Sequence, residues 1–145
     1  MSLFFKLQEE DRIEEMNRAN ANYMIIGGAA MQFYGSQRKR KDLDILIQQT
    51  PENIQKLIDA GGFGFQTGRT VDEWLQPNAH IAEEGIDIIA SWAGVDTTRF
   101  FSDVVITKIE DIQVHLPSMQ NLIEMKSLVC TEKDVEDLKF LMSIS

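Results

Sequence analysis

The chain has little that would suit it to an oxidising compartment or to a membrane. Its single cysteine, Cys130, excludes a disulfide within the chain and fits a reducing cytoplasm. No apolar run approaches the roughly 18 to 20 residues that a membrane-spanning helix needs. The first seven residues have no charged leader, and their apolar stretch is too short for a secretory signal. These absences predict a cytoplasmic protein with no membrane contact.

Basic residues are also scarce. The chain has 14 lysines and arginines against 23 aspartates and glutamates, which gives a net charge of −9. A protein that grips a long polyanion usually has the opposite balance, so we expect no non-specific nucleic-acid binding. A short contact with one end of an RNA remains compatible with this charge. The exception is the run Arg38-Lys39-Arg40-Lys41, which fits either a solvated loop or a local anion site.

The length of 145 residues suits one ordinary domain, and a hydrophobic content of 43% suits a globular core. The chain shows no repeat, no low-complexity tract and no linker. We therefore predict one domain over residues 1–145. Its expected parts are an N-terminal helix in 1–20, an α/β core in 22–116 and a C-terminal helix pair in 117–145.

Short apolar runs and turn residues predict an α+β fold with a mixed sheet. Besides the N-terminal helix, helices are expected near 29–34 and 50–61, then from 117 and from 131. Residues 61–80 are expected to be irregular. Strands are expected at 23–26, 43–47 and 86–89, with a hairpin over 104–116 that turns at Glu110-Asp111. In the last helix Thr131 and Asp134 form a predicted capping box, with Val135, Leu138 and Leu141 on one apolar face.

Two aspartates alternate with apolar residues in Asp42-Leu43-Asp44-Ile45. On a strand, residues two apart project from the same face, so Asp42 and Asp44 are expected to project together while Leu43, Ile45 and Ile47 face a core. Adjacent carboxylates repel one another, and a hard divalent cation such as Mg²⁺ removes that repulsion. Taken alone, the pair fits either a metal site or an ordinary surface strand with alternating acids.

Three further features point to anion and metal chemistry near that pair. Gly27-Gly28 lies between a predicted strand and a predicted helix, where a bare backbone can approach phosphate oxygens; an ordinary turn is the alternative. Arg38 lies shortly before the aspartates and is suited to a triphosphate. Asp87 is an isolated acid in the strand predicted at 86–89. It fits a third carboxylate beside the first two, or an acid paired with a base.

The glycine pair and the aspartate pair follow one another in an order that is found in a known protein family. Ile26-Gly27-Gly28 followed by Asp42-Leu43-Asp44 resembles the hG[G/S]…DhDh pattern of DNA polymerase β-like nucleotidyltransferases. The stretch 23–47 is most similar to small bacterial nucleotidyltransferase-like proteins related to the AbiEii toxin group. The tail resembles that group's helix pair, with Lys126 and then Lys133-Asp134-Val135-Glu136-Asp137 as its K-D-x-x-D run. Arg40 and Thr131 depart from the usual pattern. The resemblance covers residues 22–142.

The resemblance implies a metal-binding role for three carboxylates. Asp42 and Asp44 would bind Mg²⁺ that bridges the triphosphate of an NTP, with two ions expected and Mn²⁺ as a substitute. Asp87 would be the third carboxylate and would help to remove a proton from the acceptor hydroxyl. All three are therefore predicted both as catalytic residues and as metal ligands.

The resemblance also implies where the nucleotide would lie. Gly27 and Gly28 would receive its phosphates, and Lys126 would reach the same anion, as would Arg38 by its position in the chain. For Lys126, a solvated lysine on an amphipathic helix fits the sequence equally well.

The implied activity is transfer of a nucleoside monophosphate from an NTP such as ATP to an acceptor hydroxyl, with release of pyrophosphate. The acceptor is open between a small molecule, an RNA end and a protein side chain. Because the chain is short, a homodimer or an antitoxin partner would complete the acceptor site. The alternative is a non-catalytic binding or regulatory module with the same fold, as one half of a toxin–antitoxin pair.

Overall fold

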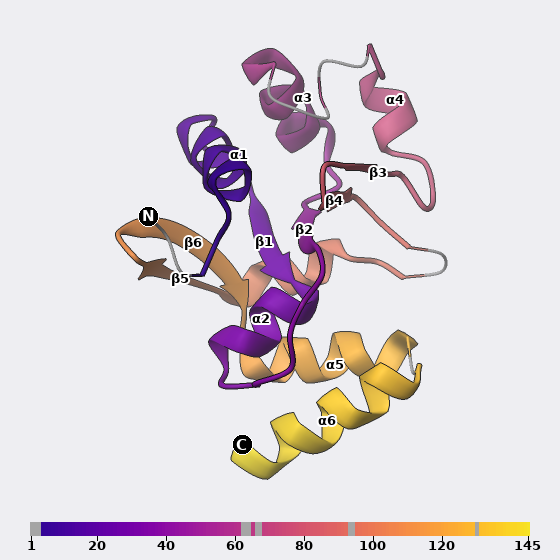
Figure 1. The fold of residues 1–145 in the computed structure, drawn as a ribbon. Helices are drawn as coiled ribbons and strands as arrows, with labels where there is room; N and C mark the ends of the chain where they lie inside the picture. The colour runs from indigo at the N-terminus through magenta and orange to yellow at the C-terminus, as the bar shows by residue number, and fades with distance from the viewer. Residues whose placement is uncertain (1–3, 62–64, 66–67, 93–94, 130) are drawn as a thin grey trace.

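The computed structural model of the protein describes residues 4–61, 65, 68–92, 95–129 and 131–145. Cys130 lies outside these residues. Figure 1 shows the elements, which follow one another as α1 (Leu7–Arg18), β1 (Tyr23–Ile26), α2 (Gly27–Phe33), β2 (Leu43–Ile47), α3 (Pro51–Ala60), α4 (Val71–Trp74), β3 (His80–Glu83), β4 (Ile86–Ile89), the 3-10 helix η1 (Thr98–Asp103), β5 (Val104–Ile109), β6 (Ile112–Pro117), α5 (Met119–Val129) and α6 (Glu132–Ile144). The arrangement confirms the predicted α+β class.

A mixed sheet holds the centre of the fold, with its strands in the order β1-β2-β4-β3. β1 runs antiparallel to β2, β2 runs parallel to β4, and β3 closes the edge antiparallel to β4. This register places Asp44 between Ile26 on one side and Asp87 on the other. The β5–β6 hairpin forms a second sheet, and β6 packs next to β1.

Both faces of the central sheet are covered, which follows from the alternation of its side chains. One face carries the odd-numbered apolar residues of β1 and β2 and packs against α1, α2 and α3. Its buried strand residues are Tyr23, Ile25, Leu43, Ile45, Ile47, Ile86 and Ile88. The opposite face has a smaller cluster that includes η1 and α5, formed by Met24, Ile26, Leu46, Phe100 and Met125. Asp44 and Asp87 belong to this second face by their register.

Two tight turns set the register of the hairpins. Glu110 and Asp111 both have positive φ and join β5 to β6, which confirms the predicted turn. Glu84 and Gly85 also have positive φ and join β3 to β4. The prediction that residues 61–80 are irregular is therefore wrong in part. α4 occupies Val71–Trp74 and β3 begins at His80. The sequence signal for the β3–β4 hairpin was weak because Glu-Gly is a poorer hairpin turn than Asn-Gly or Asp-Gly.

Two helices differ from the predictions at particular residues. α2 begins at Gly27, not near residue 29, because the chain turns into the helix directly after β1. In α6 the capping box of Thr131 and Asp134 is confirmed. The predicted apolar face is confirmed at Leu141, which is buried, whereas Leu138 is half-buried and Val135 is exposed. The other buried residues of this helix are two acids, Asp134 and Asp137.

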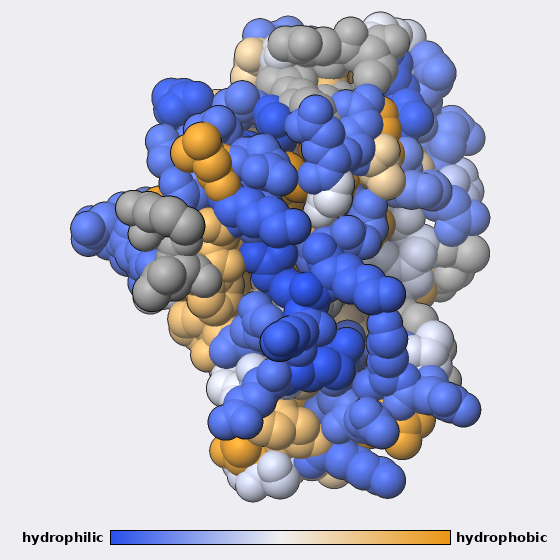
Figure 2. Space-filling model, viewed as in Figure 1, coloured by the Kyte–Doolittle hydropathy of each residue, from blue (hydrophilic) through white to orange (hydrophobic). Residues whose placement is uncertain are grey.

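The two C-terminal helices lie together below the central sheet in Figure 1. The loop that leads into β2 crosses the front of that view, and Figure 2 shows a hydrophilic surface there. Hydrophobic colour gathers at the lower edge, near the end of α6 where Met142 and Ile144 are exposed. Within the described ranges, no helix is both long enough and apolar enough to cross a bilayer.

Candidate functional site

Two of the three predicted carboxylates stand side by side on the central strands. Asp44 of β2 and Asp87 of β4 are direct neighbours in the parallel register, and both are half-buried. Their side chains are joined by a hydrogen bond. Asp42 was expected to project from the same face as Asp44, but it lies just before β2, which begins at Leu43 as predicted. It is exposed in the preceding loop and still acts electrostatically on Asp44.

The electrostatics of Asp44 reflect this crowding. Burial raises the pKa of Asp44 to about 7, helped by the hydrogen bond to Asp87 and by repulsion from Asp87 and Asp42, while Lys126 opposes the rise. A divalent cation bound beside Asp44 and Asp87 would relieve this repulsion.

The two glycines after β1 let other residues approach the backbone more closely than a side chain would allow. Gly27 has φ +63°, and a Cβ there would lie 2.3 Å from Oδ2 of Asp44. A Cβ on Gly28 would lie 2.8 Å from Cβ of Arg40. Any other residue at Gly27 would therefore displace the Asp44 carboxylate, and one at Gly28 would displace the loop before β2. The glycines fix the geometry of the carboxylates; their contact with phosphate remains a prediction.

The basic run before β2 divides into paired and exposed residues. Arg40 is almost fully buried and makes two hydrogen bonds to the carboxylate of Glu9, of 2.7 and 2.8 Å, and one of 2.8 Å to the carbonyl of Phe4. It ties the loop to the start of α1. Lys39 and Lys41 are exposed.

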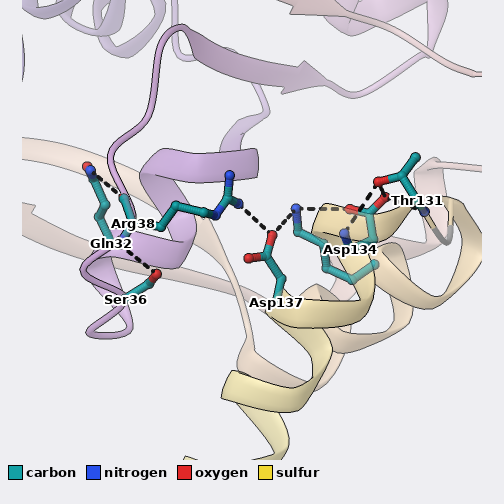
Figure 3. Close-up of polar contacts among 7 residues, drawn as sticks. Gln32, Ser36, Arg38, Thr131, Asp134 and Asp137 are labelled. Carbon is teal, nitrogen blue, oxygen red and sulfur yellow. Dashed lines mark hydrogen bonds and ion pairs between the residues drawn. The ribbon is translucent and has the colours of Figure 1, made fainter.

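A buried polar cluster joins this loop to the C-terminal helices. Asp137 of α6 accepts contacts from Nη2 of Arg38 at 2.7 Å and from Nζ of Lys126 at 2.9 Å. Lys126 also lies 3.3 Å from Asp134, which accepts hydrogen bonds from the backbone and hydroxyl of Thr131. Figure 3 shows Arg38 and Asp137 pointing toward one another across the gap between the loop and α6. The hypothesis of a solvated Lys126 is wrong, because its side chain is 11% exposed and doubly paired.

All seven predicted site residues line one cavity of about 430 Å³. They come from the turn after β1, the loop before β2, two strands and α5, and they are Gly27, Gly28, Arg38, Asp42, Asp44, Asp87 and Lys126. Sequence reasoning missed Lys133 and gave Thr131 and Asp134 only a capping role, although all three line the same cavity. The K-D-x-x-D run was the available signal, and placing it here needed the packing of α6 against α5. We call this space the basic cavity.

The donor atoms of the basic cavity suit a divalent cation. Carboxylate oxygens are the protein ligands that Mg²⁺ prefers, and the Asp44–Asp87 pair brings two of them together with Asp42 nearby. In the part of the chain that the structure describes, no three His, Cys, Asp or Glu side chains already surround a single metal position. A metal would therefore need water and phosphate oxygens as additional ligands.

Comparison with known proteins bears on the fold. No family model and no curated protein matches the chain. A solved structure, that of an antigenic nucleotidyltransferase-like protein from Paracoccidioides brasiliensis, is similar to it with a TM-score of 0.59 over 94% of this chain and 74% of that chain. This chain has a nucleotidyltransferase-like fold. The identity is 15%, so the likeness shows the fold alone, and the relation to the AbiEii toxin group stays a prediction.

Proposed function

We propose that the protein is a metal-dependent nucleotidyltransferase, which moves a nucleoside monophosphate from an NTP to an acceptor hydroxyl and releases pyrophosphate. The observation that carries the proposal is the convergence of the seven residues on the basic cavity. These residues are spread over the sequence from Gly27 to Lys126. The three carboxylates among them give the cavity the oxygen ligands that a divalent cation prefers.

Different residues of the basic cavity would bind the metal and the phosphates. Asp42, Asp44 and Asp87 would hold Mg²⁺, with Mn²⁺ as a substitute; bound there, the ion supplies positive charge that activates the hydroxyl and neutralises the leaving phosphates. Gly27 keeps the space beside Asp44 open. Lys39 and Lys41, exposed at the rim of the cavity, attract the triphosphate by charge.

Arg38 and Lys126 would act on the nucleotide from fixed positions. Asp137 holds both side chains at the cavity wall, so their N–H donors would reach a phosphate without the entropy cost of ordering free side chains. Asp137 is nearly fully buried, so it keeps Arg38 and Lys126 at the cavity wall and does not move with them toward solvent. A phosphate would therefore meet Arg38 and Lys126 already in place.

The test is thermal denaturation with each NTP, with and without Mg²⁺. Nucleotide at about 100 times its Kd stabilises the folded state by about 2.7 kcal/mol, which raises the Tm by about 5 to 10 °C for a domain of this size. We expect this shift only when Mg²⁺ and nucleotide are both present, and only with an intact Asp44.

The matched variants are Asp44→Asn and Asp59→Asn. Asp59 is an exposed carboxylate on α3, remote from the basic cavity. Asp59→Asn should keep the Mg²⁺-dependent shift, whereas Asp44→Asn should lose it. If no NTP at millimolar concentration stabilises the wild-type protein, the chain is a non-catalytic module and the proposal fails.

A further inference from the structure

A second cavity, of about 630 Å³, adjoins the basic cavity at the carboxylates. The two share a wall formed by Gly27, Asp44, Asp87, Lys126 and Asp134. Beyond that wall they extend in different directions. The basic cavity reaches toward the loop before β2, and the second reaches past β4 toward β3. We call the second space the apolar cavity.

The lining of the apolar cavity differs in chemistry from that of the basic cavity. Its own residues are mostly hydrophobic and come from β1, β3, β4, α5 and the segment after β4: Ile26, Ala82, Ile89, Trp92, Leu122 and Met125. Among the described residues, no lysine or arginine lines it apart from the shared Lys126, which is paired with two aspartates. The basic cavity has Arg38 to Lys41 and Lys133 in addition. The phosphates of a reaction therefore belong on the basic side.

We propose that the apolar cavity binds the acceptor, and that the acceptor is a small organic alcohol or phenol, neutral or positively charged, with a hydrophobic body. This inference rests on the nucleotidyltransferase function proposed above. In an in-line displacement, the attacking and leaving oxygens lie on opposite sides of the reacting phosphorus. If the leaving pyrophosphate lies against the basic cavity, the acceptor hydroxyl approaches from the apolar one.

The size and charge of the cavity select this class of acceptor. Small-molecule sites occupy about 300 to 1,000 Å³ and are mainly apolar with a few polar groups. Beyond the shared wall, the described lining of the apolar cavity includes no lysine or arginine, so no cation there would pair with the phosphates next to the hydroxyl of an RNA end. The acceptor therefore carries no phosphate.

The transfer step balances without any further reactant. The acceptor oxygen forms a bond to the α-phosphorus of the NTP, and the bond from that phosphorus to the oxygen bridging to the β-phosphorus breaks. Pyrophosphate leaves with the electron pair of the broken bond. The hydroxyl proton passes to Asp87, one of the carboxylates that both cavities share.

The experiment follows the methyl resonance of Met125 by NMR in protein labelled at the methionine methyls. Met125 lines the apolar cavity, and Met31, buried in the core on the opposite face of the sheet, is the internal reference. Met125→Leu assigns the resonance. The probes are 2-phenylethanol, tyramine, phenyl phosphate and the dinucleotide UpU. We expect saturable shifts of Met125 with the first two at millimolar concentration, and none with the two phosphate-bearing probes.

A filled-cavity variant gives the matched control. Ala82 lies on the exposed edge strand directly opposite Asp87, so Ala82→Phe narrows the cavity while Ala82→Ser preserves it. Ala82→Phe should abolish the Met125 shift and retain Mg²⁺-ATP stabilisation. The comparison of probes in the wild-type protein tests the inference even if Ala82→Phe fails to fold.

The outcomes separate this inference from the function on which it rests. Mg²⁺-ATP binding with no Met125 shift for either alcohol overturns the acceptor site alone. Equal shifts with phenyl phosphate or UpU overturn the proposed acceptor class. Loss of Mg²⁺-ATP binding in a folded Ala82→Phe protein means that the nucleobase occupies the cavity, which also overturns it. Alcohol binding without nucleotide binding overturns the nucleotidyltransferase function and the acceptor assignment with it.

Discussion

Substitution of Gly27 by alanine tests the arrangement of the site most sharply among single mutations. Gly27 has φ +63°, and the added Cβ would lie 2.3 Å from Oδ2 and 3.2 Å from Cγ of Asp44. Real Cβ atoms do not approach so closely, so the Asp44 carboxylate must rotate away and leave its hydrogen bond with Asp87. We expect Gly27→Ala to abolish Mg²⁺-dependent nucleotide binding while the protein remains folded.

The magnitude follows from two contributions. The left-handed backbone costs a residue with a Cβ about 1 to 2 kcal/mol, and loss of one part-buried hydrogen bond costs about 1 kcal/mol more. A total of about 2 to 3 kcal/mol lowers the Tm of a domain of this size by about 5 to 10 °C. Differential scanning calorimetry measures that shift, and calorimetric titration with Mg²⁺-ATP measures the loss of binding.

Gly61 offers a matched control. Its φ is +65°, nearly that of Gly27, and an added Cβ would meet no described atom within 4 Å. Gly61→Ala should therefore show only the backbone cost of about 1 to 2 kcal/mol and keep nucleotide binding. If the two variants lose equal stability and both bind nucleotide, the close approach of Gly27 to Asp44 has no role in the site, and the reasoning is refuted.

Two further predictions concern the charged groups around the cavity. Asp137→Asn removes the carboxylate that holds Arg38 and Lys126. Breaking a buried ion pair costs about 3 to 5 kcal/mol, and the cost is smaller here because Arg38 is a third exposed. We therefore expect the free energy of unfolding in urea to fall by about 2 to 3 kcal/mol, and nucleotide binding to weaken. Burial raises the pKa of Glu9, but hydrogen bonds from Arg40 and the backbone of Lys6 and their positive charges outweigh it, so the pKa lies below its ordinary 4.5. Glu9 therefore stabilises the fold above pH 4.5, and this contribution is lost as the pH falls through its lowered pKa; Glu9→Gln should flatten that part of the stability profile.

An exposed ion pair provides the control for both. Arg99 and Glu124 lie 2.9 Å apart with side chains about half exposed, so Glu124→Gln should cost less than about 1 kcal/mol. A cost for Asp137→Asn no larger than that of Glu124→Gln would contradict the view that Asp137 holds buried cations. An acid-unfolding profile identical in Glu9→Gln and wild type would contradict the account of Arg40 as an anchor for α1.

The central strands could be predicted because they carry strong local signals. Leu43 to Ile47 and Ile86 to Ile89 are short apolar runs between turn residues, and each appears at its predicted bounds. The alternation of Asp44 with Leu43 and Ile45 also predicted correctly that Asp44 projects from the opposite face of the strand to these two buried residues. What alternation did not reveal is that Leu46, on the face of the acid, is buried as well. That depends on α5 and η1 covering the second face, which is a tertiary effect.

The charged part of the site was harder to predict, because pairing depends on segments distant in sequence. Arg38 and Asp137 are 99 residues apart and form a 2.7 Å ion pair. The sequence suggested that Asp137 could pair with a base, without naming which one. Arg40 belongs to the same basic run but is buried against Glu9, so a charge run that looks uniform contains residues with different roles. β3 was missed for a local reason, the weak Glu-Gly turn that follows it.

The central claim is that Asp44 and Asp87 help to bind a divalent metal together with a nucleotide. Electron paramagnetic resonance of Mn²⁺ in the presence of α,β-methylene-ATP measures this directly, because bound Mn²⁺ loses the signal of the free ion. We predict that the wild-type protein and Asp59→Asn deplete free Mn²⁺ further than the nucleotide alone does, and that Asp44→Asn adds nothing to the depletion by the nucleotide. Equal depletion by folded Asp44→Asn and wild-type protein would contradict the account.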